Sequence, residues 1–307
     1  MQLADFESDV RTEAAIRATR LTKRFGSQVV LRDCTLAVPT GSIVGLVGEN
    51  GSGKTTLMQC LVGLLEPTEG SAEVLDEDSR QLSPATKARL GYVPQQTQLP
   101  PWLTAAEVCD YFGAFYPSWD PDHVESLAGR WRLPLDKPIR DLSGGQQQLA
   151  SLVAAMGHRP EVLILDEPVV GLDPKARRDF LTVLHELGGE PDSVHDESPP
   201  LTVLFSTHLL SDLERSATHV ALLKEGGIRL MTELSDLKES VLKLRITSPK
   251  PLPRPPLQSL AMRHDGETVV ATVTAELETH WRQWAEEYDA VVLADRLNLE
   301  DLFVELS

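Results

Sequence analysis

The sequence predicts an α/β fold that is built around a mainly parallel sheet. Residues 43–47, 162–165 and 201–205 are almost continuously apolar, as is typical of central parallel strands that are buried on both faces. A predicted helix follows each of these runs. Ligands bind outside the carboxyl ends of the strands in such sheets. The residues directly after the three runs are therefore the candidate site.

The first run leads into a glycine-rich loop and a helix. The loop fits the pattern Gly, four residues, Gly, Lys, Ser/Thr, and its residues are Gly48, Glu49, Asn50, Gly51, Ser52, Gly53, Lys54, Thr55 and Thr56. Glycines let backbone N–H groups surround a polyphosphate, and the helix, which ends at Pro67, adds the positive end of its dipole. In this pattern Lys54 reaches the β- and γ-phosphates, and Thr55 ligates Mg²⁺. A chance match is the alternative, and the flanking strand and helix argue against it.

Two further segments carry candidate contacts to a nucleotide. A predicted helix begins at Ser143, Gly144, Gly145 and Gln146, where free N–H groups and a small hydroxyl can bind an anion. Taken alone, this start is also a simple helix cap. The run 162–165 ends at Asp166 and Glu167, which can hold Mg²⁺ and activate a water, and residues 201–205 lead to His208, a candidate to touch the γ-phosphate.

The remaining segments predict a β hairpin and a group of helices around the sheet. Residues 1–15 are polar and acidic, and we expect them to be loosely ordered; residues 16–38 predict two or three strands. Phe25 either stacks on an adenine ring or is a core or hairpin aromatic. Residues 99–133 are rich in aromatic side chains and predict two helices, which either form a small core of their own or dock a partner.

The C-terminal part of the chain changes in character. A loop at 188–200 is acidic and contains prolines, and a proline-rich segment follows at 248–256. Beyond it the sequence predicts strands near 258–263, 268–274 and 290–294 with a helix near 276–288. We therefore divide the chain into a flexible N-terminus (1–15), a main domain (16–240, with a helical subdomain at about 96–140) and a small α+β domain (241–307).

Composition limits the classes of function. The chain has 307 residues, a net charge of −17 and 41% hydrophobic residues, which suits a globular protein and argues against a general affinity for nucleic acid. Its three cysteines, Cys34, Cys60 and Cys109, form no metal-ligand pair and fit free thiols in a reducing cytosol. No secretory signal and no apolar stretch of 18 residues is found, so a partner would have to hold the protein at a membrane.

The set of motifs resembles the ATP-binding subunits of ABC transporters over about residues 16–240. The loop at 48–56, Gln95, the signature segment 142–146, Asp166-Glu167, residues 171–173 and His208 occur in the family's order and at its usual spacing. Residues 116–120, 211–214 and 299–304 are similar to ATPases that pair with ABC-2-type export permeases. The chain departs from the family at Val169-Val170, at Gln147 and in the 189–200 loop, and none of these positions touches phosphate or metal.

The resemblance implies a P-loop NTPase fold of the ABC ATPase type, with a mainly parallel core sheet, an antiparallel β subdomain and a helical subdomain, plus the small C-terminal α+β domain. It implies ATP and Mg²⁺ as cofactors and ATP hydrolysis as the reaction. Thr55, Gln95 and Asp166 would form the metal site, Glu167 would activate the water and His208 would steady the γ-phosphate. Phe25 would then stack on the adenine.

The resemblance also implies partners. Two subunits, identical or different, would pack head to tail, so that each ATP lies between the 48–56 loop of one and residues 143–146 of the other. A polytopic membrane permease would hold the dimer at the inner face of the cell membrane, on the cytoplasmic side, and no nucleic acid is expected.

Two alternatives remain. A soluble ABC ATPase acting on ribosomes or nucleic acid is disfavoured by the single cassette, by the short spacing between loop and signature, and by the lack of a basic linker. A binding module that has lost hydrolysis is disfavoured because Glu167 and His208 are both present.

Overall fold

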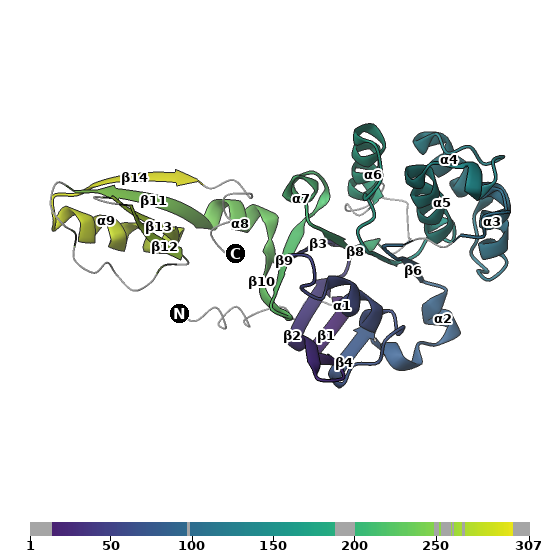
Figure 1. Ribbon diagram of the computed structural model, residues 1–307, viewed down its shortest axis with the longest axis horizontal. Helices are drawn as coiled ribbons and strands as arrows, with labels where there is room; N and C mark the ends of the chain where they lie inside the picture. The colour runs from purple at the N-terminus through teal and green to yellow at the C-terminus, as the bar shows by residue number, and fades with distance from the viewer. Residues whose placement is uncertain are drawn as a thin grey trace. The chain divides into compact units, whose positions relative to one another are not determined.

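The computed structural model describes residues 14–96, 99–187, 200–248, 252, 259, 261–265 and 268–296. Its contacts divide the chain into two compact units, one that runs to Met231 and one that starts at Thr232. The larger unit combines two sheets with a group of helices (Figure 1). The predicted N-terminal segment lies outside the described residues except for Ala14 and Ala15. These two residues are not loosely ordered, because they are buried at the start of the first strand.

A six-stranded, mostly parallel sheet forms the centre of the larger unit. Its strands lie in the order β10-β9-β3-β8-β7-β6, and the pairs β9–β3, β3–β8, β8–β7 and β7–β6 are parallel. The strands are β3 (Ile43–Val47), β6 (Leu90–Val93), β7 (Val162–Leu165), β8 (Thr202–Thr207), β9 (His219–Lys224) and β10 (Gly227–Glu233). Every residue of β3, β7 and β8 is buried, as the continuous apolar runs predict.

An antiparallel sheet and helix α1 (Lys54–Leu61) cover one face of the parallel sheet. The sheet order is β2-β1-β4-β5, from β1 (Ala14–Phe25), β2 (Gln28–Pro39), β4 (Glu69–Val74) and β5 (Glu77–Asp78). Leu57, Met58 and Leu61 of α1 are fully buried in one apolar cluster with residues from both sheets. This cluster fixes the start of α1, and with it the glycine-rich loop, directly after β3.

The helices lie mainly on the other face of the parallel sheet and beyond its β6 edge (Figure 1). Gly45 of β3 and Gly91 of β6 allow α7 and α5 to approach closely, because a Cβ atom would lie 1.9 Å from a Leu213 side-chain atom and 2.7 Å from the Ala155 carbonyl oxygen, respectively. The helical elements of this unit are η2 (Ser79–Gln81), α2 (Pro84–Lys87), α3 (Ala105–Gly113), α4 (Pro121–Trp131), η3 (Ile139–Asp141), α5 (Gly144–Met156), α6 (Pro174–Leu187) and α7 (Leu210–Ser216).

Some aromatic side chains between residues 99 and 133 pack against other residues of the unit, and others are exposed. Trp119 fits between Gly113 and Gly157, where a Cβ atom would lie 2.8 Å and 2.5 Å from its ring. Tyr116 stacks on the buried His158, with ring centroids 3.9 Å apart. These contacts tie the α3–α4 connection to the end of α5. The large exposed side chains are Trp102, Tyr111 and Phe115.

The smaller unit is a four-stranded antiparallel sheet with a nine-residue helix packed on it. Its elements are α8 (Leu234–Ser240), β11 (Val241–Thr247), β12 (Ala261–Asp265), β13 (Thr268–Thr274), η4 (Ala275–Leu277), α9 (Glu278–Glu286) and β14 (Val291–Arg296). The sheet order is β12-β13-β11-β14, and Trp281 of α9 is fully buried against Leu244 and Ile246. Because α8 contacts β11 and η4, it groups with this unit, whereas the boundary predicted at 240 assigns it to the main domain.

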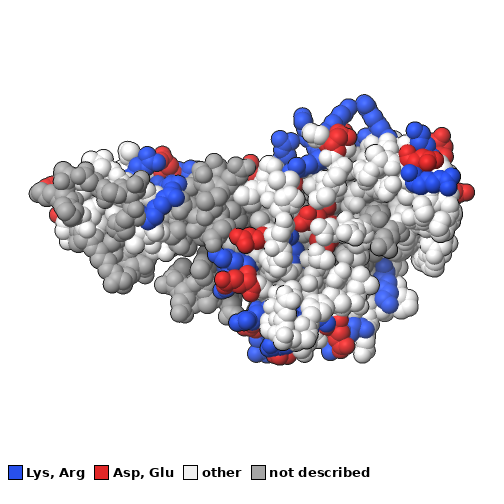
Figure 2. All heavy atoms as spheres, in the orientation of Figure 1, with Lys and Arg blue, Asp and Glu red and all other residues white. Residues whose placement is uncertain are grey.

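Several predicted segments cannot be compared with the structure. Residues 188–199, 299–304 and most of 248–256 lie outside the described residues. Within the described part of the chain, no helix is long and apolar enough to cross a membrane. On the face shown in Figure 2, acidic and basic side chains are interspersed over the larger unit, and several pair locally, such as Arg89 with Glu161 and Arg130 with Glu186.

Candidate nucleotide-binding site

Four neighbouring parallel strands bring the phosphate loop, Gln95, Asp166, Glu167 and His208 to one edge of the sheet. In spatial order β3 leads into the loop at 48–53, β8 into His208, β7 into Asp166 and Glu167, and β6 into Gln95. The parallel register pairs Leu46 with Ser206 and Leu165 with Phe205. Residues that are far apart in sequence therefore follow adjacent strand ends, which is where α/β sheets bind ligands.

The loop after β3 requires its glycines. Gly51 and Gly53 have φ angles of +83° and +108°, a region that residues with a Cβ rarely adopt. A Cβ atom on Gly48 would lie 2.4 Å from the carbonyl oxygen of Leu223. Glu49, Asn50 and Gly51 are exposed at the tip of the loop, while Gly48, Ser52, Thr55 and Thr56 are half-buried. The loop thus presents backbone amides and two threonine hydroxyls at the start of α1.

Lys54 is the buried cation of this loop. Only 6% of it is exposed, and its Nζ donates hydrogen bonds to the carbonyl oxygens of Gly48 at 2.8 Å and Glu49 at 3.1 Å. Burial lowers the pKa of the Lys54 ammonium, and the negative charges of Glu167 and Asp166 act against this shift. The two carboxylates after β7 therefore act on the same cation that the loop positions.

Ser206 joins the two carboxylate residues. Its hydroxyl is fully buried, donates to Oδ1 of Asp166 at 2.7 Å and accepts the backbone N–H of Glu167 at 2.7 Å. Glu167 has a φ angle of +48°, which is strained for a residue with a side chain. The hydrogen bond to Ser206 supports this conformation, while Oδ2 of Asp166 is buried without a hydrogen-bond partner.

His208 and Glu167 are in contact. Nδ1 of His208 lies 3.4 Å from Oε2 of Glu167, with 46% of the histidine side chain and 10% of the glutamate side chain exposed. A carboxylate in this position can accept a proton from a water, and an exposed imidazole beside it can contact a phosphate. The predicted catalytic pair is thus assembled from two strands.

Gln95 and Phe25 lie at the surface. Gln95 is exposed in the turn after β6. Phe25 ends β1, and 47% of it is exposed, so the core alternative for this side chain is wrong. The Nζ of Lys23 lies 5.2 Å from the centroid of its ring. An exposed aromatic face at the end of the β1–β2 hairpin is available for stacking.

The signature residues form a separate pocket of about 410 Å³. Ser143 and Gln146 cap α5 reciprocally, because each side chain accepts the backbone N–H of the other, at 3.3 Å and 3.1 Å. Gly145 packs so closely that a Cβ atom would lie 2.7 Å from the carbonyl oxygen of Gly171. The lining residues come from α4, α5 and the start of α6, and the described lining contains no residue of the 48–56 loop.

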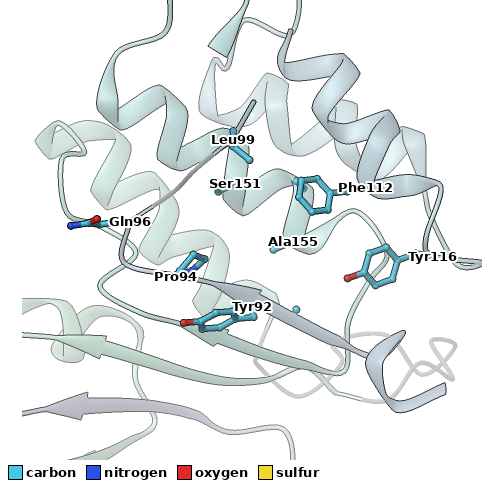
Figure 3. A pocket seen from close by; sticks show the side chains of 10 residues that line it. Tyr92, Pro94, Gln96, Leu99, Phe112, Tyr116, Ser151 and Ala155 are labelled. Carbon is cyan, nitrogen blue, oxygen red and sulfur yellow. The ribbon is translucent and has the colours of Figure 1, made fainter. Parts of the chain in front are cut away.

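A second pocket, of about 330 Å³, lies between β6 and the helices. Figure 3 shows Tyr92 and Pro94 on one side of it, and Leu99 and Phe112 on the other. Burial raises the pKa of Tyr92 to about 12, and the charge of Asp166 adds to the effect. The hydroxyl of Tyr92 is buried without a hydrogen-bond partner. This pocket therefore begins close to the carboxylates and opens among the helices.

Sequence reasoning missed Ser206, Thr207 and Asp212 as parts of the site. Ser206 and Thr207 end the buried strand β8, and Asp212 is a carboxylate with 1% exposure on α7. Buried hydroxyls and a buried acid directly before and after His208 are a signal in the sequence, but their partners become visible only in the folded chain.

Comparison with known proteins identifies the family of this chain. The family model described as ABC transporter matches residues 31–170. The ABC transporter ATP-binding protein YtrB of Bacillus subtilis is 29% identical over 231 residues, which cover 75% of this chain and 76% of that protein. The Nod factor export ATP-binding protein I of Cupriavidus metallidurans is 31% identical over 218 residues, which cover 69% of each chain.

The fold has a close counterpart among solved structures. A structure described as the ATP binding subunit of an ABC transporter superposes with a TM-score of 0.64 at 26% identity, covering 73% of this chain and 92% of that one. The chain therefore belongs to the ABC transporter family, in which it is an ATP-binding subunit with the fold and activity of an ABC ATPase.

Proposed function

We propose that this chain is the ATP-hydrolysing subunit of a membrane exporter and that its catalytic residues are Lys54, Glu167 and His208. The observation that carries the proposal is the convergence of these three side chains at one edge of the sheet. Lys54 is held inside the loop, Glu167 acts on it electrostatically, and His208 lies 3.4 Å from Glu167. A polyphosphate in the loop would have its last phosphate group directed toward this pair.

The residues present fit Mg²⁺. This ion prefers oxygen ligands and keeps several waters, so it needs few protein groups. Oδ2 of Asp166 is buried without a hydrogen-bond partner, while Oδ1 is fixed by Ser206. We assign Asp166, the Thr55 hydroxyl and the Gln95 amide oxygen to this site. When bound there, Mg²⁺ would neutralise negative charge on the phosphate groups.

The chain's own residues carry the hydrolysis step. Glu167 takes the proton of a water whose oxygen attacks the γ-phosphorus, and the bond to the oxygen of the β-phosphate breaks. Lys54 balances charge on the phosphates, and the backbone amides of residues 50–55 bind the phosphate oxygens. His208 holds the γ-phosphate and orients the Glu167 carboxylate. Phe25 stacks on the base at the exposed end of β1.

Two subunits complete the site. The signature pocket and the phosphate loop are separate in one chain, so Ser143, Gly144, Gly145 and Gln146 would bind the nucleotide of a second subunit arranged head to tail. A net charge of −17 on each subunit opposes association until ATP bridges the two surfaces. Loss of the γ-phosphate then opens the dimer. The partner is a second copy or a homologous subunit.

A membrane permease is the partner of the dimer in this proposal. The pocket between β6 and the helices has a partly apolar lining that includes Leu99, Phe112 and Tyr116, and a helix from the permease would fit such a groove. The export direction is supported by the similarity of the chain to a Nod factor export ATP-binding protein. The chain would then lie on the cytoplasmic face of the cell membrane, and the unit after Met231 would be an accessory domain.

A pull-down from native membranes tests this proposal. The Glu167→Gln variant with ATP would hold the two subunits together as the ATP-bridged dimer. We expect this dimer to recover a polytopic membrane protein in stoichiometric amount. Phe112→Asp, in the groove, should abolish this recovery, whereas Leu64→Asp, at an apolar residue that is 63% exposed elsewhere on the larger unit, should leave it unchanged. Recovery of ribosomes or nucleic acid in place of a membrane protein would contradict the transporter assignment and leave the ATPase assignment intact.

A further inference from the structure

The last residue of β8 carries a hydroxyl that the proposed mechanism does not use. Thr207 Oγ1 donates to Oδ2 of Asp212 at 3.0 Å and accepts the backbone N–H of Leu209 at 3.0 Å. The bond from Leu209 closes a turn whose middle residue is His208, and the bond to Asp212 joins the end of β8 to α7. Ser206, the preceding residue, makes the equivalent bonds to Asp166 and Glu167. The end of β8 therefore contacts the carboxylates through one hydroxyl and the histidine turn through the next.

Asp212 is a buried charge with both carboxylate oxygens satisfied. It is 1% exposed on α7, and its Oδ1 accepts a hydrogen bond from Nε of Arg177 at 2.7 Å and a second bond from Nη2 of the same guanidinium. Thr207 satisfies Oδ2. A buried carboxylate that loses a partner is strongly destabilised, so this arrangement fixes all three side chains at once.

Arg177 joins this carboxylate to the signature pocket. It lies in the first turn of α6, and its backbone N–H donates to the carbonyl oxygen of Asp173 at 2.9 Å. Oδ1 of Asp173 accepts the backbone N–H groups of Lys175 and Ala176, and Asp173 itself lines the signature pocket. The start of α6 thus lines the signature pocket and, through Arg177, also holds Asp212 of α7.

We propose that Arg177, Asp212 and Thr207 are positioning residues that set His208 against Glu167 and the γ-phosphate. The His208 side chain is 46% exposed and its contact with Glu167 is 3.4 Å long, so its direction depends on the backbone that carries it. Thr207 fixes that backbone, and Asp212 fixes Thr207 relative to α6. A displacement of about 1 Å at such a group costs up to about 100-fold in rate. The inference rests on the proposed role of His208.

Substitutions at Thr207 test the network with a matched control. Thr207→Val removes the hydroxyl and keeps the shape; we expect kcat to fall roughly 10- to 100-fold with KM for ATP unchanged. Thr207→Ser keeps the hydroxyl and should restore kcat. Ser216→Ala removes another buried hydroxyl of α7, which donates to the backbone oxygen of Asp212 at 2.9 Å. Ser216→Ala should lower the melting temperature by about as much as Thr207→Val does, and it should leave kcat unchanged.

A double-mutant cycle with His208→Ala separates positioning from general destabilisation. If Thr207 acts through His208, Thr207→Val has no further effect on kcat in the His208→Ala background. Losses that multiply, or a Thr207→Val enzyme with wild-type kcat, would overturn the proposal. If Thr207→Val does not fold, Arg177→Lys, which keeps the charge but not the guanidinium geometry, takes its place in the same cycle. A His208→Ala enzyme with wild-type kcat would instead show that the proposed role of His208 is wrong.

Discussion

Nδ1 of His208 lies 3.4 Å from Oε2 of Glu167, although the two residues belong to different strand–helix units. The contact follows from the sheet, because β7 and β8 are parallel neighbours and Leu165 pairs with Phe205. Each residue stands just beyond the end of its strand. Glu167 is also held in a left-handed conformation by the hydroxyl of Ser206. The arrangement places a proton acceptor and a phosphate contact next to the loop that holds Lys54.

Lys54→Ala should weaken ATP binding. The ammonium is the buried cation of the loop, and charged hydrogen bonds contribute about 1.5–3 kcal/mol. We expect the Kd for ATP to rise roughly 10- to 100-fold, measured by titration calorimetry. Lys87→Ala, at the exposed lysine that ends helix α2, is the control and should bind ATP like the wild type. Unchanged affinity in the Lys54 variant would contradict the phosphate-loop assignment.

The two glycines of the signature should respond differently to alanine. A Cβ atom on Gly145 would lie 2.7 Å from the Gly171 carbonyl oxygen, whereas a Cβ atom on Gly144 meets nothing within 4 Å. We expect Gly145→Ala to cost about 1–3 kcal/mol and to lower Tm by roughly 2–10 °C. Gly144→Ala, at the first position of α5, should keep or slightly raise Tm. Calorimetry without nucleotide measures both, and equal shifts for the two variants would argue against this packing.

His158 should make the protein sensitive to acid. The side chain is buried against Tyr116, and burial lowers its pKa to about 4, whereas the usual value is about 6.5. Between these values the unfolded chain binds more protons, so the free energy of unfolding falls as the pH drops from about 6.5 to about 4. The loss amounts to about 3 kcal/mol.

Urea unfolding at a series of pH values measures this effect. His158→Leu removes the titrating group and should reduce the pH dependence in that window. The control is His280→Leu, at an exposed histidine of α9, which should keep the wild-type slope. If His158→Leu and the wild type lost stability in parallel, another group would have to account for the acid sensitivity.

Most of the parallel sheet and the loops that form the site could be predicted from the sequence. Continuous apolar runs identified β3, β7 and β8, and residues such as Lys54, Glu167 and His208 directly follow such runs or begin the next helix. Strand β11 was missed, although Leu242, Leu244 and Ile246 alternate with polar residues in a pattern typical of a half-buried strand. That element was therefore accessible to prediction.

The side-chain network of the site was not accessible in the same way. The sequence alone does not identify the hydrogen-bond partners of Ser206 and Thr207. These partners depend on the register of β7 and β8 and on the packing of α6 on α7. The stack of Tyr116 on His158 likewise joins segments whose approach depends on Gly113 and Gly157 lying against Trp119. Local patterns predict elements, whereas these contacts depend on how the elements pack.

The most direct test of the account is the behaviour of Glu167→Gln with ATP and Mg²⁺. General-base catalysis contributes about 10²–10⁴-fold, so we expect ATP turnover to fall by that factor while the Kd for ATP is unchanged. Light scattering should then detect a dimer with ATP and a monomer with ADP. A variant that hydrolyses ATP at the wild-type rate would contradict the assignment of Glu167, and a monomer with saturating ATP would contradict the proposed two-subunit site.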